Sequence, residues 1–287
     1  MAFLILQIAA CVLVSVCSQW AQADSSELHV DLVIHHLSGT QVTESQILEQ
    51  ASLADALFSM AGVRVNVLEH VYHTLDDRFA DLDGMQPFAS PDEVTKSHNF
   101  YRDLQSKKVS FSPEALEVFA KVLNSGQFPE KAVHIVLAIG VRLAFYDKDK
   151  EGNWKIQSVK TGGLSFPPYY LNPLSPVHLP ELITITHHRP TILAHELGHK
   201  LINVTHEGYR ECPAFSGSSI PGLMGYHSAK DIGKGWRGRW HQERLRKSPL
   251  LYKNSPGGQR VYNQDFFEGG HYADPIYGPY IMNPICL

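Results

Sequence analysis

Segments with a strand pattern and segments with a helical pattern alternate along the chain as far as His206. A β-rich run from His29 to His36 is followed by Thr43 to Met60, where apolar residues recur at helical spacing. Thr43-Glu44-Ser45-Gln46 resembles a capping box at the start of that helix. Val63 to Leu68 then alternates in polarity, as a half-buried strand does. This order predicts an α/β fold.

The same alternation continues through the middle of the chain. A buried strand is expected at Val133–Val141, a short strand at Gly162–Phe166 and a last strand at Leu182–Thr186. A charged turn is expected at Asp147–Trp154, and helices are expected to begin at Ser112 and near Ile192.

The composition changes after His206, where Gly, Pro and Tyr become frequent. One helical stretch remains in this part, from Trp236 to Lys247. No linker-like segment separates the two parts. We therefore expect a single domain over residues 24–287, with an upper subdomain at 24–206 and a lower, irregular subdomain at 207–287.

The charge balance bears on the class of partner. The chain has 25 Lys and Arg against 29 Asp and Glu, a net charge of −4. Nucleic-acid-binding proteins normally carry a basic excess or a basic patch. After the N-terminal segment, no apolar run reaches the ~20 residues that a membrane-spanning helix needs. We expect neither a nucleic-acid partner nor stable membrane insertion.

Residues 1–23 have the composition of a secretory signal peptide. This segment has no charged residue, is almost wholly apolar over Phe3–Val16, and ends in Ala-Gln-Ala, a small-x-small cleavage pattern before Asp24. A lipoprotein signal at Cys11 is an alternative, but that cysteine comes early in the segment and no charge precedes it. A secreted protein is the expectation.

Two of the four cysteines, Cys212 and Cys286, remain after cleavage. A pair of cysteines in a secreted protein suggests one disulfide. Such a bridge would close a long loop and stabilise the fold by roughly 4 kcal/mol in the chain-entropy model. The alternative is two buried thiols.

The residues with the most specific chemistry lie at 195–199, which read His-Glu-Leu-Gly-His. Residues four apart on a helix share one face, so His195 and His199 can bind one metal ion. Zn²⁺ suits neutral imidazole ligands, and Glu196 lies off that line, where it can act as a general base towards a water. The flanking residues are apolar, as expected for a buried helix. Two ordinary core histidines are the alternative.

His206 is the candidate third metal ligand. It follows Asn203, a residue type that tolerates the left-handed conformation in which helices end. The chain could therefore turn back there and bring His206 to the metal. A downstream glutamate is the alternative third ligand.

Residues 222–226 read Gly-Leu-Met-Gly-Tyr, which places Met224 between glycines in a turn. Together with the preceding motif, this sequence resembles the metzincin clan of zinc metallopeptidases, which has H-E-x-x-H-x-x-G-x-x-H followed by a Met-turn. Simple counting puts the Gly of the clan at Ile202 and its third His at Thr205. One inserted residue would move these positions to Asn203 and His206.

The resemblance implies a metzincin-like catalytic domain, with a twisted mixed sheet, backing helices, an active-site helix and an irregular lower part. It implies a zinc-dependent endopeptidase with His195, His199 and His206 as metal ligands and Glu196 as general base. Met224 would form an apolar floor below the metal. In some families of the clan a Tyr two residues after the Met assists catalysis, which corresponds to Tyr226. A protein or peptide substrate would lie along the sheet edge near residues 162–166.

Two alternatives to this function are open. In a gluzincin-type zinc peptidase, Glu243 would be the third ligand. In a secreted binding module, the zinc would have a structural role and no turnover would occur. An intact Glu196 argues against the second alternative, because a structural zinc site needs no general base. A monomer is expected in either case.

Overall fold

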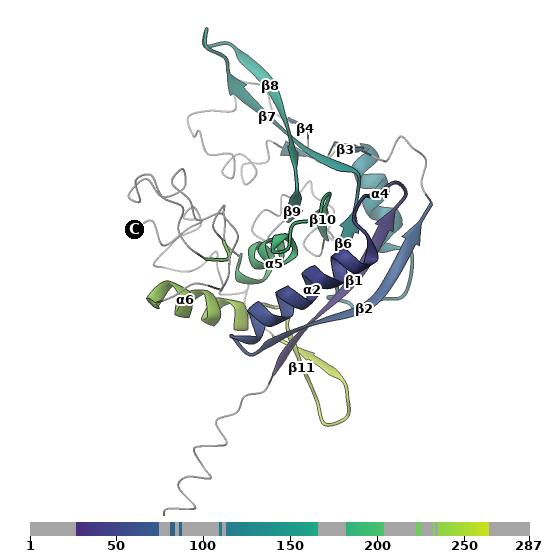
Figure 1. Ribbon diagram of the computed structural model, residues 1–287, viewed down its shortest axis with the longest axis vertical. Helices are drawn as coiled ribbons and strands as arrows, with labels where there is room; N and C mark the ends of the chain where they lie inside the picture. Colours follow the sequence, from purple (N-terminus) through teal and green to yellow (C-terminus); the bar gives the residue numbers. More distant parts are fainter. Residues whose placement is uncertain are drawn as a thin grey trace, which may run out of the picture.

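A mixed seven-stranded sheet forms the centre of the molecule (Figure 1). The computed structural model describes residues 27–74, 81–83, 86–87, 109–110, 113–165, 182–203, 222–224, 232 and 235–263. The strands of the sheet are β1 (Leu28–Leu37), β2 (Val63–His73), β6 (Val133–Leu137), β9 (Gly163–Ser165), β10 (Leu182–Ile185), β11 (Tyr252–Asn254) and β12 (Arg260–Tyr262). Their order is β12-β11-β1-β6-β10-β9, with β2 also pairing with β1.

Four of these strands run parallel. β1 pairs in parallel with β2 and β6, and β6 with β10, whereas β9 runs antiparallel to β10. Parallel strands are typically covered on both faces and are therefore apolar throughout. Nine of the ten residues of β1 are buried, which fits this position. The α/β prediction is confirmed, and β2 continues five residues beyond the expected end at Leu68, to His73, because it follows β1 along its whole length.

Helix α2 (Glu44–Ser59) connects β1 to β2. The expected capping box is present: the Thr43 hydroxyl accepts from the Gln46 amide at 3.3 Å, and the Gln46 side chain accepts from the Thr43 amide at 2.9 Å. These two bonds satisfy amides that have no partner within the helix. The prediction of this helix is therefore confirmed, including the way it begins.

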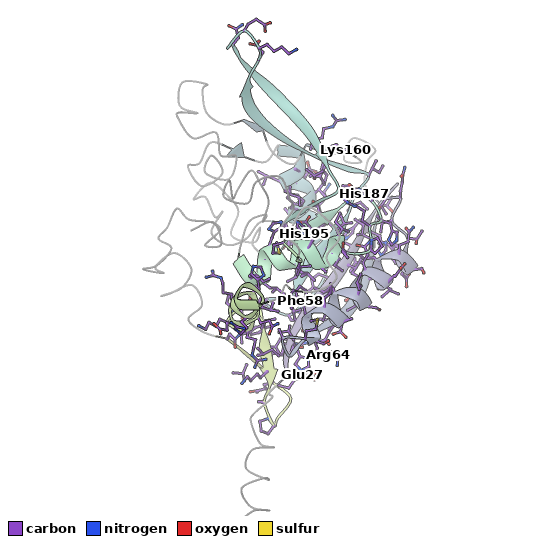
Figure 2. The ribbon with its side chains drawn as sticks, turned by 60° about the vertical axis from the view of Figure 1, so that its left-hand side comes forward. Glu27, Phe58, Arg64, Lys160, His187 and His195 are labelled. Carbon is purple, nitrogen blue, oxygen red and sulfur yellow. The ribbon has the colours of Figure 1, made fainter. Side chains whose placement is uncertain are left out.

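A long hairpin projects from the body of the molecule in both ribbon views (Figure 1, Figure 2). It consists of β7 (Gly140–Lys148) and β8 (Trp154–Thr161), and β3 (Asp81–Asp83) pairs with β7. The expected single strand Val133–Val141 is wrong: the chain leaves the main sheet after Leu137 and enters this second sheet. The remaining elements here are β4 (Gln86–Pro87), β5 (Val109–Ser110) and α4 (Pro113–Leu123).

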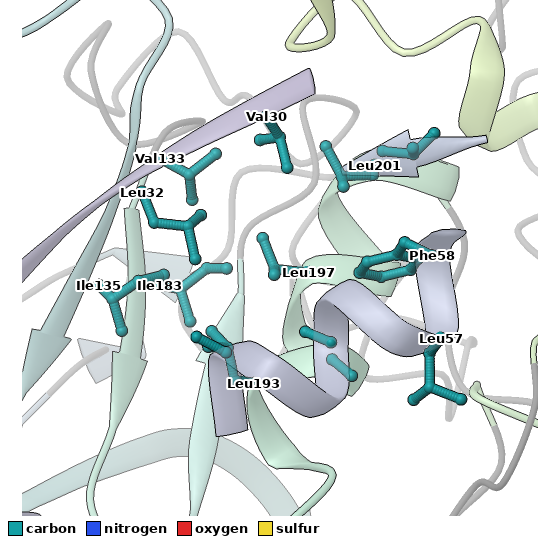
Figure 3. Close-up of a cluster of buried hydrophobic side chains, with 14 of the residues drawn as sticks. Val30, Leu32, Leu57, Phe58, Val133, Ile135, Ile183, Leu193, Leu197 and Leu201 are labelled. Atoms are coloured by element: carbon teal, nitrogen blue, oxygen red, sulfur yellow. The ribbon is translucent and has the colours of Figure 1, made fainter. Parts of the chain in front are cut away.

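The hydrophobic core lies between the sheet and two helical segments (Figure 3). The sheet contributes buried side chains such as Val30, Leu32 and Ile183. Helix α2 contributes Leu57 and Phe58. The segment that follows β10 completes this core, and it carries the His-Glu-Leu-Gly-His motif.

The C-terminal part of the described chain joins the same sheet. Helix α6 (Gly235–Arg246) agrees with the expected helical stretch, and β11 pairs antiparallel with β1 through Tyr252 and His29. The sheet therefore includes strands from both sides of residue 206. None of the described helices is long and apolar enough to cross a membrane. The predicted signal peptide with Cys11, and the predictions for His206, Cys212, Tyr226 and Cys286, fall outside the described residues.

Candidate metal centre

The motif lies on one helical segment, which we call the motif helix. It consists of α5 (Ile192–Gly198) and a π-helical turn, η4 (His199–Asn203), directly after it. Leu193, Leu197 and Leu201 recur on its inner face and are fully buried in the core. This apolar stripe fixes the rotation of the helix, and it thereby also fixes where the two histidines point.

His195 and His199 converge on one point. Their Nε2 atoms are 3.1 Å apart, and the two ring planes are nearly perpendicular, at 84°. Two nitrogens that each bind Zn²⁺ at 2.0–2.1 Å with a tetrahedral angle lie roughly 3.3 Å apart. The pair therefore has the spacing of two ligands of one tetrahedral metal ion.

The orientation of His195 is set by a backbone carbonyl. Its Nδ1–H donates to the Leu223 carbonyl oxygen at 2.7 Å. Because a carbonyl only accepts, this bond places the ring hydrogen on Nδ1 and the lone pair on Nε2, towards His199. Burial lowers the pKa of His195, which keeps the imidazole neutral, as a metal ligand must be.

Glu196 is 6% exposed and lies beside the two histidines in the sequence. Burial raises the pKa of its carboxyl to about 8, and the nearby Lys200 ammonium acts in the opposite direction. A cation held by the histidines would favour the carboxylate further. In its carboxylate form the group can accept a proton, as a general base does.

Met224 lies directly behind the motif helix. It is fully buried, and a Cβ atom on Gly198 would overlap its Sδ atom. Leu223, which fixes His195, is the preceding residue. The absence of a side chain at Gly198 therefore allows residues 222–224 to approach the helix closely enough for both contacts.

Strand β9 passes over Glu196 at the edge of the sheet. A Cβ atom built on Gly163 would lie 2.6 Å from the Glu196 Oε1 atom. The neighbouring Gly162 faces the ring of His187 in the same way. Within the described part of the chain, β9 is an edge strand that pairs with β10 only, and it lies beside the carboxylate of Glu196.

Helix α6 packs against the far end of the motif helix. The Arg244 guanidinium, 8% exposed, donates from Nε to the Ile202 carbonyl at 3.1 Å. His241 is buried one turn earlier and bonds the Ile232 carbonyl at 3.0 Å through Nδ1. Glu243, the alternative third ligand, is exposed to solvent.

The described residues contain no group of three His, Cys, Asp or Glu side chains that could hold a metal ion. Since His195, His199 and Glu243 all lie within that part, Glu243 does not complete a site with the two histidines. The structure thus brings the side chains of His195 and His199 together and places Met224 against the same helix. His206, the expected third ligand, lies outside the described residues.

Two contributors to this site have no local signal in the sequence. Gly163 is one of 21 glycines, and only the approach of β9 to Glu196 distinguishes it. Arg244 lies in a basic helix whose charged residues are typical of a solvated surface. Its burial depends on the packing of α6 against a segment 42 residues earlier.

The sequence matches no protein-family model and no curated protein. Among solved structures, it is similar to the crystal structure of metalloproteinase-II from Bacteroides fragilis, at 13% identity and a TM-score of 0.36, over 76% of this chain and 53% of that one. A chaperone–substrate complex is similar at 10% identity and a TM-score of 0.33, over 77% of this chain and 38% of that one. The chain thus spans about half or less of each, and likenesses this low assign no family.

Proposed function

We propose that this protein is a secreted zinc-dependent endopeptidase of the metzincin type. One observation carries the proposal: the Nε2 atoms of His195 and His199 converge at 3.1 Å on the helix that also carries the buried carboxyl of Glu196. Structural zinc sites are commonly closed by four protein ligands. Two converging imidazoles with a general base between them in the sequence favour a catalytic site instead.

The third ligand in this proposal is His206. A π-helical turn closes its hydrogen bonds between residues i and i+5, so it holds one residue more than an α-helical turn. The turn at His199–Asn203 lies where the spacing to His206 exceeds the clan motif by one residue. The additional residue is thus absorbed within the helix, which supports His206 over Thr205 as the ligand.

Bound zinc would lower the pKa of its water towards ~7, from 15.7 in bulk water, and polarise the peptide carbonyl. Glu196 accepts the water proton at its carboxylate and passes it to the leaving amine. Tyr226 donates a hydrogen bond to the developing oxyanion. Met224 fills the apolar space behind the helix, and His195 is held in the required tautomer by Leu223.

The substrate in this proposal is an extended peptide that pairs with the open edge of β9. Such pairing supplies main-chain hydrogen bonds whatever the side chains are. Because Gly163 has no side chain, the backbone of β9 lies close to the Glu196 carboxylate, and a peptide paired with β9 would lie next to the strand that contacts this group. In this proposal the mature chain, residues 24–287, acts as a monomer and contains a disulfide between Cys212 and Cys286.

Incubation of the mature chain, residues 24–287, with a mixed peptide library tests this function. We expect internal cuts by the wild type with zinc present, and none by Glu196→Ala at equal zinc content. Zinc binding without any cuts would favour the binding module over the peptidase. Cuts that survive in Glu196→Ala would remove this residue from the mechanism.

A further inference from the structure

Three exposed basic side chains lie where strands β8 and β9 meet. Lys160 is the penultimate residue of β8, and His187 and Arg189 lie in the connection between β10 and the motif helix. Figure 2 labels Lys160 and His187 near the base of the projecting hairpin. The Arg189 carbonyl accepts from the Ile192 amide at 3.0 Å, which holds this residue at the start of the motif helix. We call Lys160, His187 and Arg189 the basic cluster.

Backbone contacts place the basic cluster beside β9. The Thr186 amide donates to the Gly162 carbonyl at 2.9 Å. The ring of the next residue, His187, then lies against Gly162, where a Cβ atom would overlap it. A Cβ atom on Gly163 would instead meet the Glu196 carboxyl. Two successive residues at the start of β9 therefore lie against the basic cluster and against the carboxyl of the motif helix.

The charges of the cluster act on each other and on the metal pair. Burial lowers the pKa of His187, and the charges of Arg189, His188 and Lys160 lower it further. Burial is also the main cause of the lowered pKa of His195, and the charge of Arg189 adds to it. The guanidinium of Arg189 is thus close enough to influence both the cluster and a candidate metal ligand.

The cluster has no carboxylate partner within the described part of the chain. Neither the Lys160 ammonium nor the Arg189 guanidinium forms an ion pair there. The nearby His188 faces α2 instead, where its Nε2 atom is 3.8 Å from a Glu49 carboxylate oxygen. The whole chain has a net charge of −4, so this positive region is a local feature. Grouped like charges without a counter-charge favour the binding of an anion.

We infer that the basic cluster binds a carboxylate side chain of the peptide that pairs with β9, so that the site selects substrates with an acidic residue. This inference rests on the proposed function, from which it takes the path of the peptide. Main-chain pairing with a strand edge does not distinguish sequences, whereas an ionic contact beside that edge does. Arg189 can hold a carboxylate through two N–H groups, and Lys160 adds a second charge.

The test measures binding of end-blocked peptides that carry either Glu or Gln at one position, which is moved along the peptide. A chelator is present, so that the mature chain binds the peptides without zinc-dependent cleavage. At one position we expect the Glu peptide to bind about 5- to 20-fold more tightly than the Gln peptide, the contribution of two exposed ion pairs. This preference should shrink at high salt. With zinc restored, the same preference should appear in the KM for cleavage.

Substitutions in the cluster assign this preference to its residues. Arg189→Gln and Lys160→Gln should each weaken binding of the Glu peptide by about 2- to 5-fold and leave the Gln peptide unchanged. Both side chains are exposed, so neither change should affect folding. Lys253→Gln is the matched control: it removes the same charge from an exposed position on β11, which β1, β6 and β10 separate from β9 in the sheet.

Equal binding of the Glu and Gln peptides by the wild type would overturn the inference. An equal loss in Lys253→Gln would also overturn it, because net charge alone would then explain the effect. The proposed function is tested separately. Cleavage without a preference for acidic residues would keep the peptidase and remove the carboxylate site. Binding that prefers the Glu peptide, with no cleavage when zinc is restored, would keep the carboxylate site and remove the peptidase.

Discussion

Two groups of histidines in this molecule have similar distances between ring nitrogens but different arrangements of the rings. On the motif helix, labelled by His195 in Figure 2, two Nε2 atoms point at each other at 3.1 Å. On the sheet, His35 bonds His73 through Nδ1 and His134 through Nε2, both at 2.9 Å. The first group converges on a point, whereas the second forms a chain of three rings across β2, β1 and β6.

The difference follows from the backbone that carries each group. Residues four apart on a helix project from one face in similar directions. On neighbouring strands, rings meet side by side and pair in sequence across the sheet. His35, at 0% exposure, thereby uses each ring nitrogen on a different neighbour. Close nitrogens alone therefore do not indicate a metal site, because the lone pairs must also share one target.

The largest effect we predict is on the catalytic rate, and it separates catalysis from metal binding on the motif helix. Glu196→Gln keeps the shape of the side chain but removes the base. We expect the kcat/KM for peptide cleavage to fall by about 100- to 10,000-fold, the usual contribution of general acid–base catalysis. Zinc content, measured in parallel, should stay at the wild-type level. Loss of zinc in this variant would mean that Glu196 is needed for binding.

The second prediction compares the two groups directly. His199→Ala removes one of two converging nitrogens, so we expect zinc affinity to fall by more than about 100-fold, beyond the effect of residues that only orient ligands. His134→Ala removes the last ring in the row of histidines on the sheet and should leave zinc affinity within a few-fold of the wild type. Equilibrium dialysis against zinc measures both. A comparable loss in His134→Ala would break the distinction.

A third prediction concerns the packing behind the helical group. Gly198→Ala drives a methyl group against the Met224 sulfur, so we expect a loss of about 1–3 kcal/mol in the free energy of unfolding. Gly257→Ala is the control, because a Cβ there meets only the Ser255 hydroxyl, at 3.9 Å. Denaturant titration measures both. Equal stability of the two variants would show that residues 222–224 can move away without cost.

The smallest predicted effect is a pH dependence that belongs to the sheet group. Burial, with His134, His73 and His36 nearby, lowers the pKa of His35 from 6.5 to about 3. Below pH 6.5 the unfolded chain therefore binds a proton at His35, whereas the folded chain binds this proton only near pH 3. Stability from this group is complete above pH 6.5 and decreases as the pH falls. We expect a loss of about 2 kcal/mol between pH 7 and pH 5.

His35→Gln tests this prediction in the presence of a chelator, so that proton release on metal binding does not contribute. The variant should be less stable than the wild type at pH 7, because it breaks two hydrogen bonds, of which the one to His134 is buried. It should nevertheless lose less stability on going to pH 5. If the variant loses as much stability as the wild type between pH 7 and pH 5, the acid sensitivity belongs to other groups.

Much of the fold was predictable where the signal is local. The helix over Thr43–Met60 follows from its apolar period and its capping residues, and the structure has both. The hairpin of β11 and β12 was not predictable. It is attached through Asp31, a buried carboxylate that accepts from Tyr252 at 2.8 Å and from Arg260 at 2.7 Å. These partners lie more than 200 residues away, and no local pattern connects them.

The sequence by itself determined that two imidazoles one helical turn apart flank a glutamate, because the helical period is a local property. Only the tertiary structure decided which ring nitrogens converge, since that depends on the Leu223 carbonyl. It also decided that Glu196 is buried with a raised pKa, and that Gly163 and Met224 enclose the motif helix. These properties arise from packing between segments distant in the chain, and their energies depend on the exclusion of water, which spacing alone does not encode.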